Sequence, residues 1–183
     1  GIYTLYQFGR KDAFPGMDET ELPEGSINKN AGNNISIVNA IQNPQNFYVW
    51  DWTNWTTNFG YYNLWSADNN TPGLNDNAVI KTVYDPCPVG FKMPASNAFT
   101  GFTSNGQYQS GAANVNVDGT ADSWDKFSAA YGHNFWTNSS KNATIFFPAS
   151  GYREPNDGPL RNVGAVSYCW SASPGNTSTS VNL

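Results

Sequence analysis

The sequence predicts an α+β fold in which short strands and two or three short helices are joined by long loops. Charged residues make up 13% of the chain, against about 25% in an average soluble domain. The surface is therefore covered largely by neutral polar residues, including Asn and Gly, which favour turns. Runs of β-forming residues are short and are separated by polar segments. Helical spacing of apolar residues extends over only six to nine positions at a time.

The expected strands are runs rich in β-branched and aromatic residues between turn-forming residues. They cover residues 2–8, 78–84, 143–147, 152–153 and 166–171. Between the first two strands, the Phe-Pro-Gly sequence at 14–16 predicts a turn, and the polar composition of residues 18–34 predicts a long loop.

Three short segments have features typical of helices. They are residues 36–41, 96–102 and 123–131. The first carries Ile37 and Ile41 one turn apart, and Pro44 would end it. Ser96 is expected to cap the second helix at its N-terminus. The third would place Trp124, Phe127 and Tyr131 on one face.

We expect residues 1–183 to form a single domain that is the C-terminal part of a larger exported protein. The length of 183 residues suits one domain. The chain begins with Gly1 instead of Met, and an alternating pattern stops abruptly at its end. No apolar run approaches the length that a membrane span requires. The net charge of −5 and the lack of a Lys/Arg cluster argue against nucleic-acid partners and against anionic lipid.

Three groups of residues occur in an order that resembles a known family. Residues 9–16 read Gly-Arg-Lys-Asp-Ala-Phe-Pro-Gly. Residues 81–94 read Lys-Thr-Val-Tyr-Asp-Pro-Cys-Pro-Val-Gly-Phe-Lys-Met-Pro, of which residues 85–94 are the most specific part. Residues 147–153 read Phe-Pro-Ala-Ser-Gly-Tyr-Arg, and Cys-Trp-Ser-Ala-Ser follows at 169–173. This order resembles the "Fibrobacter major paralogous" domain of fimbrillin-like lipoproteins and other surface proteins of gut Bacteroidetes-type bacteria.

The resemblance implies a compact C-type-lectin-like domain with small antiparallel sheets. It also implies an extracytoplasmic location, at the bacterial outer-membrane surface or in a fimbrium. Glycans or other fimbrial subunits would be the partners. The low charge and the many turns agree with a location outside the cytoplasm.

The two cysteines, Cys87 and Cys169, allow one disulfide. Members of the family usually end with an extended segment that contains Val-Arg-Cys, and this chain has no such segment. The resemblance therefore implies another partner for Cys87, which disfavours the Cys87–Cys169 pairing.

The densest group of aromatic residues, nine in residues 47–65, is the leading candidate for ligand contact. Aromatic faces stack on sugar rings, and neighbouring Asn, Asp and Thr side chains bond the hydroxyl groups. The expected ligand-binding residues are Trp50, Trp52, Trp55, Tyr61 and Tyr62. The alternative is that these rings belong to the core, since each aromatic side chain buries a large area.

The Glu154-Pro155-Asn156 triplet matches one that calcium-dependent C-type lectins use. Together with Asp157, it offers hard oxygen ligands that suit Ca²⁺. The lectin site also needs a downstream Trp-Asn-Asp sequence, where this chain has Trp-Ser-Ala at 170–172. The alternative is a proline-centred turn between two strands, and no cofactor other than calcium is expected.

The residues that could perform catalysis are few. His133 is the single histidine, and no Ser or Cys stands in a nucleophile elbow. We therefore expect a non-enzymatic adhesion or binding module. A carbohydrate-binding module that uses residues 47–65 is the alternative, and an enzyme similar to the formylglycine-generating family is a third hypothesis.

Overall fold

The computed structural model describes residues 4–29, 37–48, 64–68, 75–106, 115–119, 132–174 and 180–182. Within these ranges the fold is α+β, with short strands, few helices and long connections, as the sequence predicts. The elements are β1 (Thr4–Tyr6), β2 (Ala13–Pro15), η1 (Glu19–Glu21), β3 (Asn28–Lys29), α1 (Ile37–Gln42), β4 (Asn46–Phe47), η2 (Ser96–Phe102), β5 (Gly132–Trp136), β6 (Thr144–Pro148), β7 (Tyr152–Arg153), β8 (Leu160–Arg161), β9 (Trp170–Pro174) and β10 (Ser180–Asn182). In the described part of the chain, no helix is long and apolar enough to span a bilayer.

The strands pair two by two. β1–β2, β5–β6, β7–β8 and β9–β10 are antiparallel, as expected. The expectation of antiparallel sheets is wrong for β3 and β4, which pair in parallel with Asn28 opposite Asn46. Parallel neighbours need a crossover connection in place of a hairpin, and the segment that contains α1 joins these two strands.

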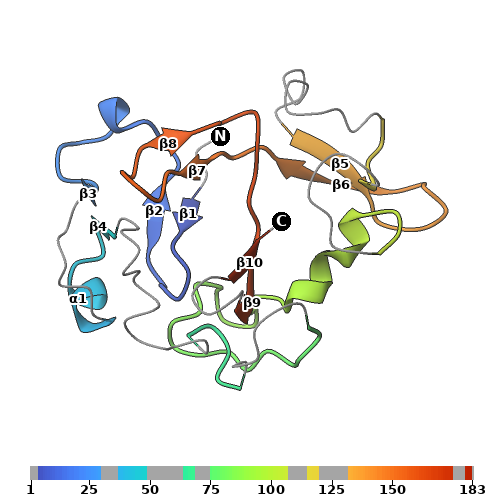
Figure 1. The fold of residues 1–183 in the computed structure, drawn as a ribbon, viewed down its shortest axis with the longest axis horizontal. Helices are drawn as coiled ribbons and strands as arrows, with labels where there is room; N and C mark the ends of the chain where they lie inside the picture. Colours follow the sequence, from blue (N-terminus) through green and yellow to red (C-terminus); the bar gives the residue numbers. More distant parts are fainter. Residues whose placement is uncertain are drawn as a thin grey trace.

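The paired strands form two groups (Figure 1). The pairs β1–β2, β3–β4 and β7–β8 lie on one side together with α1, and β5–β6 lies on the other side beside η2. β9 and β10 lie between the two groups. β9 is joined to the segment before η2 because the Ala172 amide donates to the Pro94 carbonyl at 2.7 Å.

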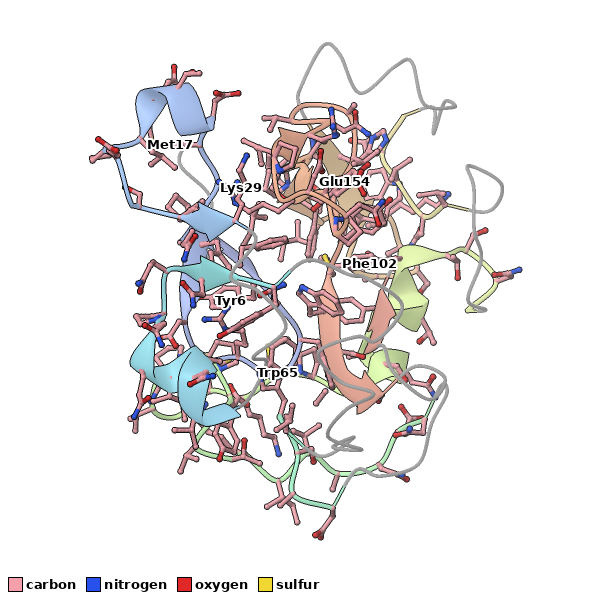
Figure 2. All side chains as sticks on the ribbon, turned by 60° about the vertical axis from the view of Figure 1, so that its left-hand side comes forward. Tyr6, Met17, Lys29, Trp65, Phe102 and Glu154 are labelled. Carbon is pink, nitrogen blue, oxygen red and sulfur yellow. The ribbon has the colours of Figure 1, made fainter. Side chains whose placement is uncertain are left out.

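The main core surrounds Trp65, whose side chain is completely buried. Phe8, Val79 and Ala172 are buried in the same cluster as Trp65, which Figure 2 labels. The Phe8 and Trp65 rings meet edge to face with centroids 4.9 Å apart, a favoured geometry for aromatic pairs. The indole Nε1 donates to the main-chain carbonyl of Arg10 at 3.3 Å, so the buried polar atom has a partner.

A second aromatic cluster joins η2 to the β5–β6 hairpin. Phe102 stacks on Phe135 with centroids 4.4 Å apart and meets Phe147 edge to face at 4.6 Å. Phe99 packs against Phe102 from the same helix. These contacts hold one face of the hairpin against η2.

Two buried arginines connect segments that are distant in sequence. The Arg10 guanidinium donates to the carbonyls of Ala40, Pro44 and Asn46, around the C-terminal end of α1. The Arg153 guanidinium donates to the Pro15 carbonyl and to two other carbonyls, those of Met17 and Gly158. Because a buried charge is costly unless it is hydrogen-bonded, these contacts stabilise the packing of the loops. Burial lowers the pKa of Arg10.

Several expected elements are present. α1 covers most of residues 36–41, η2 covers residues 96–102, and β1 lies within residues 2–8. β6 overlaps residues 143–147, and β7 covers residues 152–153. The expected helix at 123–131 lies outside the described residues.

Other expectations are wrong. Residues 78–84 form no strand but a single bridge between Lys81 and Ser66, because the Ser66 hydroxyl takes the Ile80 amide that a ladder would use. The expected turn at 14–16 is largely strand β2, and Pro15 is tolerated there because each strand of a two-stranded sheet is an edge strand. In residues 166–171, Ser167 makes only a bridge and β9 begins at Trp170. Strand β5 was not expected.

The predicted N-terminal cap of η2 is also wrong. Ala95 occupies the cap position and makes no side-chain hydrogen bond. The Ser96 hydroxyl instead accepts a hydrogen bond from the Asn75 amide at 2.9 Å and donates to the Asn75 carbonyl. Ser96 therefore joins η2 to a distant loop.

Candidate functional site

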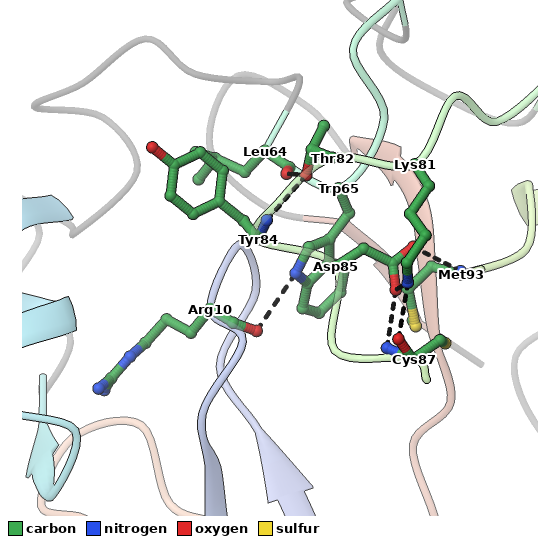
Figure 3. A network of polar contacts seen from close by, with 9 residues as sticks. All are labelled: Arg10, Leu64, Trp65, Lys81, Thr82, Tyr84, Asp85, Cys87 and Met93. Atoms are coloured by element: carbon green, nitrogen blue, oxygen red, sulfur yellow. Dashed lines mark hydrogen bonds and ion pairs between the residues drawn. The ribbon is translucent and has the colours of Figure 1, made fainter. Parts of the chain in front are cut away.

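The loop at residues 81–93 is organised around the buried carboxylate of Asp85 (Figure 3). Its Oδ1 accepts hydrogen bonds from the Lys81 ammonium at 2.9 Å and from the Cys87 amide at 2.8 Å. Its Oδ2 accepts one from the Met93 amide at 2.9 Å. One side chain thus holds the beginning, the middle and the end of the loop.

The charge of Asp85 is stabilised in place. Burial opposes ionisation, but the hydrogen bonds from Lys81 and from the amides of Met93 and Cys87 outweigh it, and the pKa of Asp85 is lowered. The Lys81 ammonium also donates to the Cys87 carbonyl at 2.7 Å. The carboxylate and the ammonium together satisfy main-chain groups that the irregular loop cannot pair by itself.

The local sequence explains why this loop is neither helix nor sheet. Pro86 and Pro88 have no amide hydrogen to give to a ladder. The Phe91 amide donates to the Pro88 carbonyl at 3.0 Å, which closes a turn. Gly90 has φ 88° in this turn, a left-handed conformation that favours glycine.

The loop exposes large apolar side chains. Val89 is 97% exposed, Val83 75% and Phe91 69%. We call these three residues the apolar loop residues. Surface apolar residues are common singly, but here three occur within nine positions on a loop that hydrogen bonds hold in place.

No family model, curated protein or solved structure matches this chain.

The five expected ligand-binding aromatic residues, Trp50, Trp52, Trp55, Tyr61 and Tyr62, lie outside the described residues. Three other rings of the same stretch are described, and all of them are buried: Phe47, Tyr48 and Trp65. Phe47 meets Phe14 edge to face at 5.4 Å. For these three rings, the alternative interpretation as core residues is correct.

The expected calcium ligands lie in the turn between β7 and β8. The Gly158 amide donates to the Glu154 carbonyl at 2.8 Å, which closes the turn. The Asn156 amide group donates to Glu154 Oε1 at 3.2 Å. Arg161 lies 3.5 Å from the Asp157 carboxylate and 3.9 Å from that of Glu154. The Arg161 guanidinium thus offsets part of the charge of the two carboxylates, and calcium binding here stays a prediction.

No group of three acidic, His or Cys side chains in the described ranges is placed to hold a metal ion.

A shallow groove of about 530 Å³ runs between residues 16–21 and 160–163. Asp18, Glu21 and Arg161 line it together with apolar side chains. A hydrogen bond from the Thr20 amide lowers the pKa of Asp18.

The two cysteines are free thiols in the structure. Burial and the nearby Asp85 charge raise the pKa of Cys87, and burial raises the pKa of Cys169. Both thiols are therefore protonated at neutral pH, and a protonated thiol is a poor nucleophile. Burial lowers the pKa of His133, which favours the neutral imidazole.

The apolar loop residues were not among the expected site residues. The signal that could have identified them is their position between turn formers. Val89 lies between Pro88 and Gly90, and Phe91 follows directly. A tight turn leaves little room to bury a large side chain, so apolar residues at its corner are expected to face solvent.

Proposed function

We propose that this domain is a non-enzymatic binding or adhesion module, displayed outside the cytoplasm on a bacterial surface or fimbrium. It contacts a protein partner through the apolar loop residues Val83, Val89 and Phe91. The observation that carries the proposal is the exposure of these side chains on a loop that Asp85 holds in place.

Rigid apolar anchors are effective in protein–protein contacts. Most of the binding energy of an interface comes from a few large side chains that fill pockets of the partner. Holding such side chains in one conformation before binding reduces the entropic cost of association. The hydrogen bonds of Asp85 to both ends of the turn provide this preorganisation.

The state of the possible catalytic groups supports a non-enzymatic role. Both thiols have raised pKa values, and the pKa of His133 is lowered. A thiolate nucleophile is disfavoured at both cysteines, because both of their pKa values are raised.

The family membership and the C-type-lectin-like arrangement belong to the same proposal. The segment with the most specific resemblance, residues 85–94, is the one that Asp85 organises. Its Asp, Pro and Gly residues each have a structural task in the loop.

The test compares partner capture by two variants. The double variant Val89→Ser/Phe91→Ser removes two anchors, and Val38→Ser is the matched control, since Val38 is 60% exposed on α1. Immobilised wild-type domain is exposed to an outer-membrane and fimbrial protein fraction. We expect a retained protein to be lost with the double variant and kept with the control. Equal retention by all three proteins would contradict the proposal.

A further inference from the structure

The outer face of the β5–β6 hairpin carries a mixed aromatic and polar surface. In the register of this pair, Asn134 lies opposite Phe146, and Trp136 lies opposite Thr144. Side chains alternate between the two faces of a strand, and directly opposed residues share a face. These four side chains therefore lie on one face, which we call the hairpin face.

The other face of the same hairpin is occupied. Its residues include Phe135 and Phe147, and both rings contact Phe102 of η2. The hairpin face is thus the one turned away from η2. On it, Asn134, Phe146 and Thr144 are exposed and Trp136 is half-buried.

Backbone hydrogen bonds also join β5 to residues 116–118. The Asp118 amide donates to the Asn134 carbonyl at 2.8 Å, and the Trp136 amide donates to the Asn116 carbonyl at 3.0 Å. The side-chain amide of Asn116 also donates to the Trp136 carbonyl at 3.2 Å. Residues 115–118 therefore extend the pair sideways and position both Asn134 and Trp136.

The absence of a side chain at Gly132 leaves room for the Phe146 ring on this face. A Cβ atom at Gly132 would lie 2.7 Å from Cζ of Phe146. The phenyl ring thus lies over the glycine backbone, while 47% of the residue stays exposed. One side of the Phe146 ring thus contacts the hairpin backbone, and the rest of the ring is open to solvent.

The chemistry of the hairpin face fits one class of ligand. It offers two aromatic rings, one amide and one hydroxyl, and none of these groups is charged. The electron-rich face of an aromatic ring attracts the slightly positive C–H groups of a sugar ring. Amide and hydroxyl side chains donate to and accept from sugar hydroxyls. An anionic or cationic ligand finds no countercharge among these four side chains.

We propose that the hairpin face, formed by Asn134, Trp136, Thr144 and Phe146, binds a neutral saccharide. This site is separate from the apolar loop residues, so it goes beyond the proposed protein contact. It also differs from the aromatic stretch at 47–65, to which the sequence assigned sugar binding. Trp136 and Phe146 stack on the ring, while Asn134 and Thr144 bond its hydroxyls.

The experiment is affinity electrophoresis of the whole 183-residue chain in gels that contain mannan, xylan or hydroxyethyl cellulose. Polygalacturonate is the charged comparison. We expect retardation by at least one neutral polymer and none by polygalacturonate. We expect Phe146→Ala and Asn134→Ala each to raise the dissociation constant obtained from the retardation by about tenfold. The loss of one stacking or polar contact reduces affinity by about that factor.

Ile145→Ala is the matched control, since Ile145 is 51% exposed on the opposite face of the same strand. We expect this variant to bind as the wild type does. Circular dichroism of every variant checks that the fold is kept. Because Asn134 is exposed, Asn134→Ala remains informative even where Phe146→Ala unfolds.

Three results would overturn the proposal: no retardation by any neutral polymer, retardation that survives both face substitutions, or equal loss with Ile145→Ala. The Val89→Ser/Phe91→Ser variant separates this site from the protein contact. We expect this double variant to bind saccharide as the wild type does, because the hairpin face does not include either residue. Loss of saccharide binding in the double variant would contradict the assignment of the site to the hairpin face.

Discussion

The ammonium group of Lys81 lies 2.9 Å from Oδ1 of Asp85, in an ion pair of which one member is fully buried and the other partly exposed. The same carboxylate accepts two main-chain amides, those of Cys87 and Met93. The pair therefore does more than neutralise a charge. It gives partners to amides in a segment that has no regular secondary structure.

Asp85→Asn is expected to destabilise the domain by about 2–3 kcal/mol, because a neutral amide group meets two amide donors with a single acceptor oxygen. Urea unfolding followed by tryptophan fluorescence measures the change. Asp157→Asn is the control, since the Asp157 side chain is 57% exposed and its ion pair is long. A surface pair of this kind contributes little, so equal losses for the two variants would contradict the role of Asp85.

Acid is expected to remove the advantage that Asp85 provides. Its pKa is lowered in the folded protein, so the stabilisation is complete above the unfolded pKa of about 3.9 and is lost as the pH falls through the lower folded value. The gap in unfolding free energy between wild type and Asp85→Asn should narrow below about pH 4. The pKa of Asp18 is also lowered, but Asp18 is present in both proteins, so its effect on stability cancels in the difference between them. A gap that is constant with pH would refute this.

Gly151→Ala is expected to cost more than Gly25→Ala. Both glycines have positive φ, 73° and 80°, so each substitution pays about 1–2 kcal/mol for the left-handed conformation. At Gly151 the new Cβ would also lie 2.5 Å from the Arg161 carbonyl oxygen, whereas nothing lies within 4 Å at Gly25. The clash adds about 1–3 kcal/mol. Thermal unfolding of both variants tests the difference, and equal melting temperatures would show that the β7–β8 region adjusts freely.

Alkylation of Cys87 and Cys169 is expected to be slow at neutral pH in the folded protein. Because both pKa values are raised, the thiolate fraction is smaller than in an unfolded chain at the same pH. We expect iodoacetamide to react at least about tenfold more slowly than after denaturation. Mass spectrometry counts the modified thiols over time. If denatured, unreduced protein took up no label, the two cysteines would be paired and not free.

Local sequence patterns predict the elements that depend on neighbours in the chain. α1 follows from the one-turn spacing of Ile37 and Ile41, and η2 lies where residues 96–102 were predicted to be helical. Residues 89–94, expected to be extended, instead begin with a turn that the Phe91 amide closes on the Pro88 carbonyl. A strand has no such independence, since it exists only where a partner lies beside it. This is why residues 78–84 have strand-like composition but form a single bridge, and why β5 was not expected.

The candidate site, too, depends partly on local sequence and partly on contacts between distant segments. The sequence by itself determined the α+β class, the low charge and the exclusion of helix and inner strand at Pro86 and Pro88, because composition and backbone restrictions act locally. Only the tertiary structure decided that Asp85 is buried against Met93, that Arg10 reaches the end of α1, and which face of β5–β6 stays open. Those outcomes depend on contacts between distant segments, and packing, not spacing in the chain, determines them.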